Sequence, residues 1–177
     1  MEAVPVVDEI EDPRRTEPPY IADERTMLDN WLEFHRFTLL FKCEELDADL
    51  RKKRVVPTSK LSLHGLVRHM AEVERGWFRR TLLREPDVAY IFADPEVEDS
   101  ELVPLGDATW ENDLAAWQAE CEHSRAAAAS RELDDTGLRR GEEVSLRWIY
   151  VHMIEEYARH NGHADILREL LDERVGW

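Results

Sequence analysis

Hydrophobic residues recur at helical spacing in four long segments of the chain, and polar, glycine-containing or proline-containing stretches separate these segments. The pattern predicts four helices, over residues 24–54, 62–83, 110–133 and 146–173. Pro57 follows the first helix, and three more prolines lie between the second and the third. No segment shows the period-two alternation of a half-buried strand. Four helices of this length favour an all-α fold, a four-helix bundle.

Residues that flank the predicted helices support these boundaries. Asp107 or Thr109 provides an N-cap for the third helix, and Ser145 provides one for the fourth. Gly137 and Gly141 indicate a break between these two helices. The N-terminal residues 1–22 differ from the rest, because four prolines among acidic residues prevent regular structure. We therefore expect an extended or disordered arm over residues 1–22 and one bundle domain over residues 23–177.

Composition limits the partners and the compartment. The 39 acidic and 23 basic residues give a formal net charge of −16, which repels phosphate backbones and anionic membrane surfaces. Nucleic acid and membranes are therefore poor partners. No stretch reaches the apolar length of a membrane span or a signal segment. Cys43 and Cys121 are the two cysteines and lie far apart in the sequence, as in a protein of the reducing cytoplasm.

The fourth predicted helix carries four ionisable residues on one face. At about 100° per residue, His152, Glu156, His160 and His163 fall within an arc of about 80°. The same sector contains the apolar residues Ile149, Met153, Leu167, Leu170 and Leu171. The opposite sector contains Arg147, Asn161, Asp165 and Arg168. Burying imidazoles and a carboxylate without partners costs free energy, so a metal ion or a mutual hydrogen-bond network should compensate them.

Helical spacing narrows the choice of metal ligands. Glu156 and His160, at i and i+4, can converge on one ion, and His160 with His163, at i and i+3, is a second possibility. On the second helix, His69 shares a sector with the apolar Leu66, Val73 and Trp77, whereas His64 lies on the opposite side and should face solvent. A site of His69, Glu156 and His160 would leave open positions for water or substrate.

Two classes of function are compatible with these residues. In the first, the protein is a metal-dependent enzyme in which the ion activates a small thiol or a water molecule. In the second, it is a non-catalytic binding or stress-related bundle, in which the histidines and Glu156 form a buried hydrogen-bond network. The metal content of the purified protein distinguishes the two.

Two segments, Leu63–Phe78 (LHGLVRHMAEVERGWF) and Trp148–Glu169 (WIYVHMIEEYARHNGHADILRE), resemble one branch of the DinB-like superfamily. The resemblance extends over nearly the whole chain after Asp23 and includes Thr38–Asp47 (TLLFKCEELD) and Val56–Leu61 (VPTSKL). It implies a four-helix bundle that holds a divalent metal, often zinc or nickel. In such bundles one ligand comes from the second helix and two come from the fourth.

The ligand pattern departs from the commonest form of this superfamily. Many relatives have a His-x-x-x-His pair on the fourth helix, whereas Glu156 stands here in place of the first histidine, with His160 as the second. The mycothiol-dependent maleylpyruvate isomerases are similar in using a Glu-x-x-x-His pair with a histidine of the second helix. The resemblance therefore implies His69, Glu156 and His160 as metal ligands. It also implies thiol transfer or thiol-dependent isomerisation, with a small-molecule thiol as partner.

Two further residues receive roles in this scheme. His163, one turn beyond His160, is expected to act as a base behind the ligands, and Arg159 is expected to hold an anionic substrate. The alternative for Arg159 is a surface residue paired with Glu155 or Glu156. The sequence also has six tryptophans, Trp31, Trp77, Trp110, Trp117, Trp148 and Trp177. Some of them should lie near the surface of so small a bundle, which suggests a homodimer.

Overall fold

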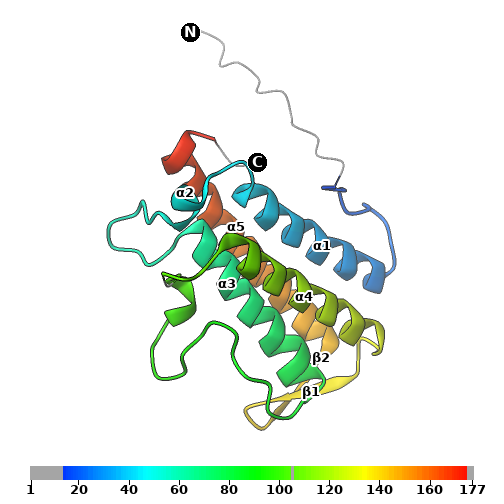
Figure 1. Cartoon of the computed structure of the whole chain (residues 1–177). Helices are drawn as coiled ribbons and strands as arrows, with labels where there is room; N and C mark the ends of the chain where they lie inside the picture. The colour runs from blue at the N-terminus through cyan, green and yellow to red at the C-terminus, as the bar shows by residue number, and fades with distance from the viewer. Residues whose placement is uncertain (1–13, 105, 175–177) are drawn as a thin grey trace.

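The computed structural model of the chain describes residues 14–104 and 106–174. Its elements, in chain order, are the helices and strands α1 (Glu24–Cys43), α2 (Ala48–Lys52), α3 (Leu63–Glu74), the π-helical η1 (Arg75–Leu82), the 3-10 turn η2 (Ser100–Leu102), α4 (Trp110–Ala129), β1 (Thr136–Arg139), β2 (Glu142–Ser145) and α5 (Leu146–Asp172). Helix α1 packs along α5, and α3 with η1 packs along α4 (Figure 1). These four long segments form a bundle, so the predicted all-α bundle is confirmed.

Side-chain caps begin the helices at the polar residues that precede the apolar pattern. The carboxylate of Asp23 accepts a hydrogen bond from the backbone N–H of Thr26 at the start of α1. Ser62 caps α3 and Ser145 caps α5 in the same way. Of the two candidates for the third long helix, Thr109 is the cap of α4.

The first helix is shorter than predicted. Helix α1 ends at Cys43, and the next residues turn the chain with Glu45 in the left-handed region at φ 56°. Asp47 then caps the short α2 by accepting from the backbone N–H of Leu50 at 2.8 Å. The prediction of one helix through residue 54 is therefore wrong after Cys43, because a local carboxylate cap competes with continuation of the helix.

A β-hairpin, which the sequence pattern did not predict, joins α4 to α5. Strands β1 and β2 pair antiparallel from Thr136↔Ser145 to Arg139↔Glu142. Arg140 and Gly141 form the two-residue turn, and both have positive φ, as a type I′ turn requires. Figure 1 shows the hairpin at one end of the bundle, below η1. A Cβ atom on Gly137 would lie 2.2 Å from the carbonyl oxygen of Thr81, so glycine lets β1 approach the backbone of η1 this closely.

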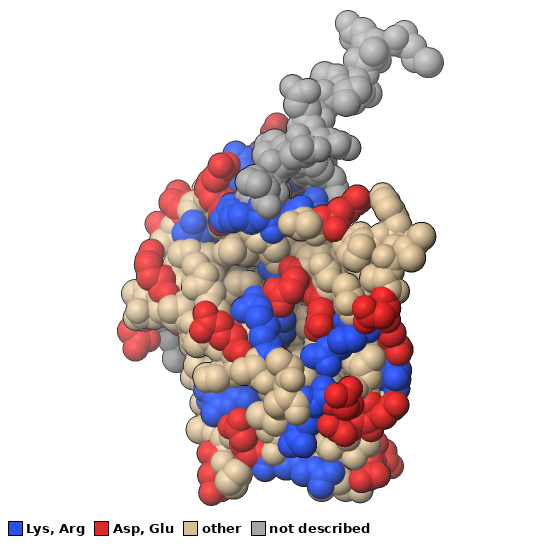
Figure 2. Space-filling model, turned by 90° about the vertical axis from the view of Figure 1, so that its right-hand side faces the viewer, with Lys and Arg blue, Asp and Glu red and all other residues tan. Residues whose placement is uncertain are grey.

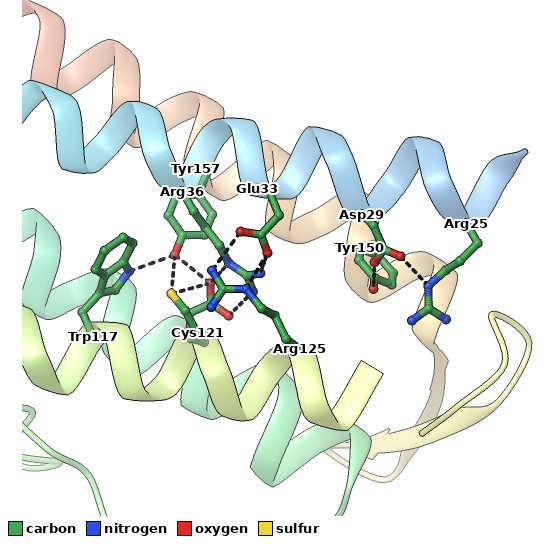
Figure 3. A network of polar contacts seen from close by, with 10 residues as sticks. Arg25, Asp29, Glu33, Arg36, Trp117, Cys121, Arg125, Tyr150 and Tyr157 are labelled. Atoms are coloured by element: carbon green, nitrogen blue, oxygen red, sulfur yellow. Dashed lines mark hydrogen bonds and ion pairs between the residues drawn. The ribbon is translucent and has the colours of Figure 1, made fainter. Parts of the chain in front are cut away.

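A buried polar network joins all four bundle helices (Figure 3). Arg36 of α1 donates two hydrogen bonds, of 2.8 and 2.7 Å, to the carboxylate of Glu74 at the end of α3. The hydroxyl of Tyr157 on α5 donates to Glu74 at 2.6 Å and accepts from the indole N–H of Trp117 on α4 at 3.0 Å. The Cys121 sulfur lies 3.7 Å from the same Glu74 oxygen. Because Glu74 is fully buried, Arg36 is the partner that makes its charge tolerable there.

Part of the predicted N-terminal arm contacts α1. Residues 1–13, like Trp177 at the other end, lie outside the described residues. Arg14 forms a two-fold ion pair with Glu44, with N···O distances of 2.9 and 2.8 Å. The guanidinium of Arg15 lies 4.4 Å from the centre of the Phe34 ring. The described end of the arm is therefore held against the bundle.

Charged side chains of both signs cover the face that Figure 2 shows, which is the right-hand side of Figure 1. Acidic and basic groups are interspersed on this face, so the overall charge of −16 does not create a single acidic patch there. Within residues 14–104 and 106–174, none of the helices is both long enough and apolar enough to cross a membrane.

Candidate metal centre

The three expected metal ligands lie close together. Helix α3 positions His69, and α5 positions Glu156 and His160 one turn apart, facing α3. One possible ligand atom from each residue lies within 4.8 Å of the other two. The ring centres of His69 and His160 are 4.7 Å apart, and Glu156 Oε2 is 3.5 Å from His160 Nε2. Two imidazoles and one carboxylate at these separations form a donor set of the kind that divalent zinc or nickel binds.

Neighbouring side chains orient both imidazoles. His69 Nδ1 lies 2.9 Å from a carboxylate oxygen of Glu101, which leaves Nε2 of the ring available to an ion. His160 points Nε2 towards Glu156, and its Nδ1 lies 3.4 Å from Nδ1 of His163. Metal-binding histidines commonly have a hydrogen-bond partner on the second ring nitrogen in this way. The residues present therefore fit a divalent ion.

Glu101 is a site residue that sequence reasoning missed. It belongs to η2, inside the proline-containing stretch between α3 and α4, where no periodic pattern indicates which side chains turn inward. Its contact with His69 depends on how this stretch folds back over α3, which is a tertiary feature.

The carboxylate of Glu156 is in its ionised form at neutral pH. The hydrogen bond with His160 lowers the pKa of Glu156, although partial burial acts in the opposite direction. His152 Nε2 lies 3.3 Å from the other Glu156 oxygen. Burial lowers the pKa of His152, whose ring stacks on Trp148 at 5.0 Å and contacts Trp77 at 4.4 Å. His152, Glu155 and Glu156 form a second, overlapping group of possible ligands.

His163 and Arg159 lie away from the position that an ion would take. His163 stands behind His160, and burial together with the nearby His160 lowers its pKa. Arg159 forms an ion pair with Glu155, with an N···O distance of 2.7 Å, and its side chain is 61% exposed. Arg159 thus has the surface ion pair that was the alternative to substrate binding.

The expectation that His64 faces solvent is wrong. Its side chain is fully buried, and Nε2 lies 2.8 Å from a carboxylate oxygen of Asp113 on α4. The same oxygen accepts a hydrogen bond of 2.7 Å from Arg68. The helical projection assigned the His64 side of α3 to solvent, but α4 packs against this side. A buried polar side chain needs a hydrogen-bond partner, and Asp113 is the partner of His64.

The inward face of α5 is also broader than predicted. Asn161 and Arg168, assigned to the solvent side, are almost completely buried. Asn161 donates to the backbone carbonyl of His35 at 3.0 Å, and Arg168 donates to that of Lys42 at 2.8 Å. Leu170, assigned to the core, is 56% exposed. The physical reason is that α1 covers this side of α5 and brings backbone carbonyls that accept from these side chains.

A cavity of about 360 Å³ opens beside His69 and Glu156, two of the three candidate ligands. His69, Glu156 and His152 contribute to its wall. The remaining wall includes Trp77 and Arg80 of η1, Tyr90 of the loop after η1, Glu101 of η2 and Arg139 of β1. His69 and Glu156 therefore face a space in which a small molecule can bind.

The two cysteines of the chain are unsuited to act as nucleophiles. Burial raises the pKa of Cys43 to about 12, and burial together with the Glu74 carboxylate raises the pKa of Cys121 well above its ordinary value. Both thiols are therefore protonated at neutral pH, and the thiolate is the reactive form of cysteine. A sulfur reaction at this site would use a thiol from outside the chain.

Comparison with known proteins identifies the family. No curated protein matches the chain. The profile described as mycothiol-S-transferase matches residues 27–173, which include all four bundle helices except the first turn of α1. The match agrees with the resemblance to the DinB-like superfamily and its mycothiol-dependent members. The chain belongs to the mycothiol-S-transferase family.

Proposed function

We propose that the protein is a metal-dependent thiol transferase, in which His69, Glu156 and His160 bind one divalent ion, zinc or nickel. The observation that carries the proposal is the convergence of these three side chains from two helices, two of which, His69 and Glu156, line the 360 Å³ cavity. Family membership supports the class of reaction, which is transfer of mycothiol, through its sulfur, to a second substrate.

The chemistry requires a thiolate at neutral pH. When bound, the ion supplies Lewis acidity, which lowers the pKa of a thiol next to it. The thiolate then attacks an electrophilic carbon of the second substrate. A carbon–sulfur bond forms, the leaving group departs with the bonding electron pair, and the proton of the thiol passes to solvent water.

The residues of the chain prepare the site for this reaction. Glu101 and His163 hold the rings of His69 and His160 in the orientations described above, so we propose that they are positioning residues. This role replaces direct proton transfer by His163, whose imidazole faces His160 instead of the cavity. Trp77 and Trp148 enclose His152 and restrict the access of water on that side.

Metal content tests the proposal. The wild-type protein should bind zinc or nickel at one ion per chain, and His69→Ala and His160→Ala should each lose stoichiometric binding, because each removes one of three protein ligands. His123→Ala is the matched control, since His123 is an exposed histidine of α4 and should not affect binding. Elemental analysis after dialysis against each metal gives the result. Full metal retention by both His69→Ala and His160→Ala would contradict the assignment.

The alternative function is a non-catalytic bundle with a histidine and glutamate network. One observation favours it: His152, Glu156, His160 and His163 form a continuous series of contacts of 3.3, 3.5 and 3.4 Å. This network would satisfy the groups without an ion. Folded protein that takes up no divalent metal and catalyses no transfer from mycothiol would support the alternative.

A further inference from the structure

Arg139 is a cation on the cavity wall without an acidic partner. It lies on β1, and its guanidinium stacks over Trp77 at 4.1 Å from the ring centre. In the part of the chain that the structure describes, no carboxylate forms an ion pair with Arg139. Burial lowers the pKa of Arg139, and the nearby cations Arg140 and Arg80 lower it further, although Tyr90 acts in the opposite direction. An anion bound in the cavity would offset the repulsion between Arg139 and the neighbouring cations.

The carboxylates of the same cavity are already engaged. Glu72 accepts hydrogen bonds from the backbone N–H groups of residues 91, 92 and 93, with distances of 2.6, 2.7 and 3.1 Å. Glu101 holds His69, and Glu156 contacts His160 and His152. None of these groups is directed at Arg139, so the cation remains available to a ligand.

Arg80, the other cation of the cavity wall, has a structural task. It donates to the backbone carbonyls of Val88 and Ala89, both at 3.0 Å, and stacks over Tyr90 at 4.1 Å from the ring centre. Arg80 thereby fixes the loop that carries Tyr90. Of the two cations, Arg139 is the one whose side-chain donors have no protein acceptor among the described residues, whereas Arg80 has two.

The position of Arg139 is fixed by the hairpin. Gly137, two residues earlier on β1, packs against the backbone of Thr81 and Leu82 in η1. The next residues reverse the chain through the tight turn at Arg140 and Gly141. This anchorage holds Arg139 over Trp77, on the same cavity wall as His69 and Glu156. A rigidly held guanidinium loses little freedom when it binds a planar anion.

We propose that Arg139 recognises a carboxylate group of the electrophilic substrate, and that Trp77 and Tyr90 contact its aromatic or apolar part. The inference rests on the proposed transferase function and names the class of its second substrate. A guanidinium can donate two parallel hydrogen bonds to a carboxylate. A carboxylate bound by Arg139 places the remainder of a small molecule in the cavity that His69 and Glu156 line.

Binding of a matched pair of electrophiles tests the inference. The probes are 4-chloro-3-nitrobenzoate and its methyl ester, which differ in the negative charge, and isothermal titration calorimetry without thiol measures their binding. Arg139→Ala should weaken binding of the acid about 10-fold to 100-fold, because hydrogen bonds to charged groups have this effect, and should leave binding of the ester unchanged. Arg131→Ala, which removes an exposed cation that does not line the cavity, is the control and should affect neither probe.

Two outcomes overturn the inference. One is a wild-type protein that binds the acid no more tightly than the ester, and the other is an Arg139→Ala variant that keeps the wild-type preference. Arg139→Lys keeps the charge but loses the paired donors, and should lie between the wild type and the alanine variant. Circular dichroism of each variant verifies that it is folded.

The same probes separate this inference from the proposed function. In the transfer reaction, the thiolate attacks the carbon that bears chlorine, the carbon–sulfur bond forms, and chloride leaves with the bonding electron pair. If binding of the acid depends on Arg139 but no transfer from mycothiol occurs, the proposed function is contradicted and the anion site is supported. If transfer occurs and the Arg139→Ala variant has the same ratio of acid rate to ester rate as the wild type, the proposed function is supported and the anion site is contradicted.

Discussion

His64 lies at the contact between α3 and α4, where its imidazole shares the Asp113 carboxylate with Arg68. Replacement by alanine removes a buried hydrogen bond to a charged group. We expect His64→Ala to lower the free energy of unfolding by about 1–3 kcal/mol at pH 7.5 without changing metal content. Urea denaturation followed by circular dichroism measures the first quantity. An unchanged unfolding midpoint would show that the contact contributes nothing to stability.

The same residue predicts a pH dependence. Burial lowers the pKa of His64 from its ordinary value of 6.5, although the Asp113 carboxylate acts in the opposite direction. The unfolded chain therefore binds a proton at this residue more readily than the native chain. The contribution of neutral His64 is complete above about pH 6.5 and declines as the pH falls below it. The stability difference between wild type and His64→Ala should therefore be smaller at pH 5.5 than at pH 7.5, and a larger difference at pH 5.5 would contradict the sign.

At the scale of elements, the close contact between β1 and η1 yields a prediction. Gly137→Ala places a methyl group against the backbone of Thr81 and Leu82, so the hairpin must shift. We expect a loss of about 1–3 kcal/mol in the free energy of unfolding, as for other overpacked sites. The bound metal should be retained, because no ligand lies on the hairpin. Gly106→Ala is the control, since nothing lies within 4 Å of a Cβ atom there. Equal stability of the two variants would show that the hairpin is not seated as described.

The elements also show what the sequence could predict and what it could not. The long helices follow from apolar periodicity together with caps such as Ser62 and Ser145. The hairpin was missed because strands of four residues are too short to show alternation, and its turn residues were interpreted only as a break between helices. The π-helical geometry of η1 has no sequence pattern distinct from that of an α-helix.

For the candidate site, helical spacing made Glu156 with His160, or His160 with His163, the possible pairs and gave His69 as the inward histidine. The family resemblance then favoured His69, Glu156 and His160. The burial of His64 and Asn161 was not predictable in this way. It depends on which neighbouring helix covers each side, and that is a property of the assembled bundle. The sequence pattern did not indicate that Arg139 lies at the site either, because its position depends on how the hairpin folds back onto η1.

At the scale of the whole molecule, a bound ion would connect residue 69 of α3 with residues 156 and 160 of α5. The unfolded chain has no such cluster, so metal should bind preferentially to the native state. At a free metal concentration about 100-fold above the dissociation constant, the added stability is about 2.7 kcal/mol. A strong chelator should therefore lower the melting temperature of metal-loaded wild-type protein and leave that of His160→Ala unchanged. An equal midpoint with and without chelator, in protein shown to contain metal, would contradict an ion between the helices.

Two expectations about the whole protein stay predictions. Trp31 and Trp148 are 40% and 48% exposed, which agrees with the expectation of aromatic groups near the surface. Whether they mediate a homodimer is a question for light scattering at micromolar concentration. The cytoplasmic location is likewise an expectation from the sequence.

The hairpin that carries Arg139 is separate from the helices that carry the candidate ligands. Ten residues, 136–145, form this piece at one end of the bundle, and only its last residue, Ser145, also serves α5, as its cap. Divergence within the family can therefore alter the turn and the residue at position 139 while the interior of the bundle stays constant. Exchange of this hairpin between relatives is then a route by which evolution, or a directed library, changes which electrophile is accepted and preserves the centre that activates the thiol.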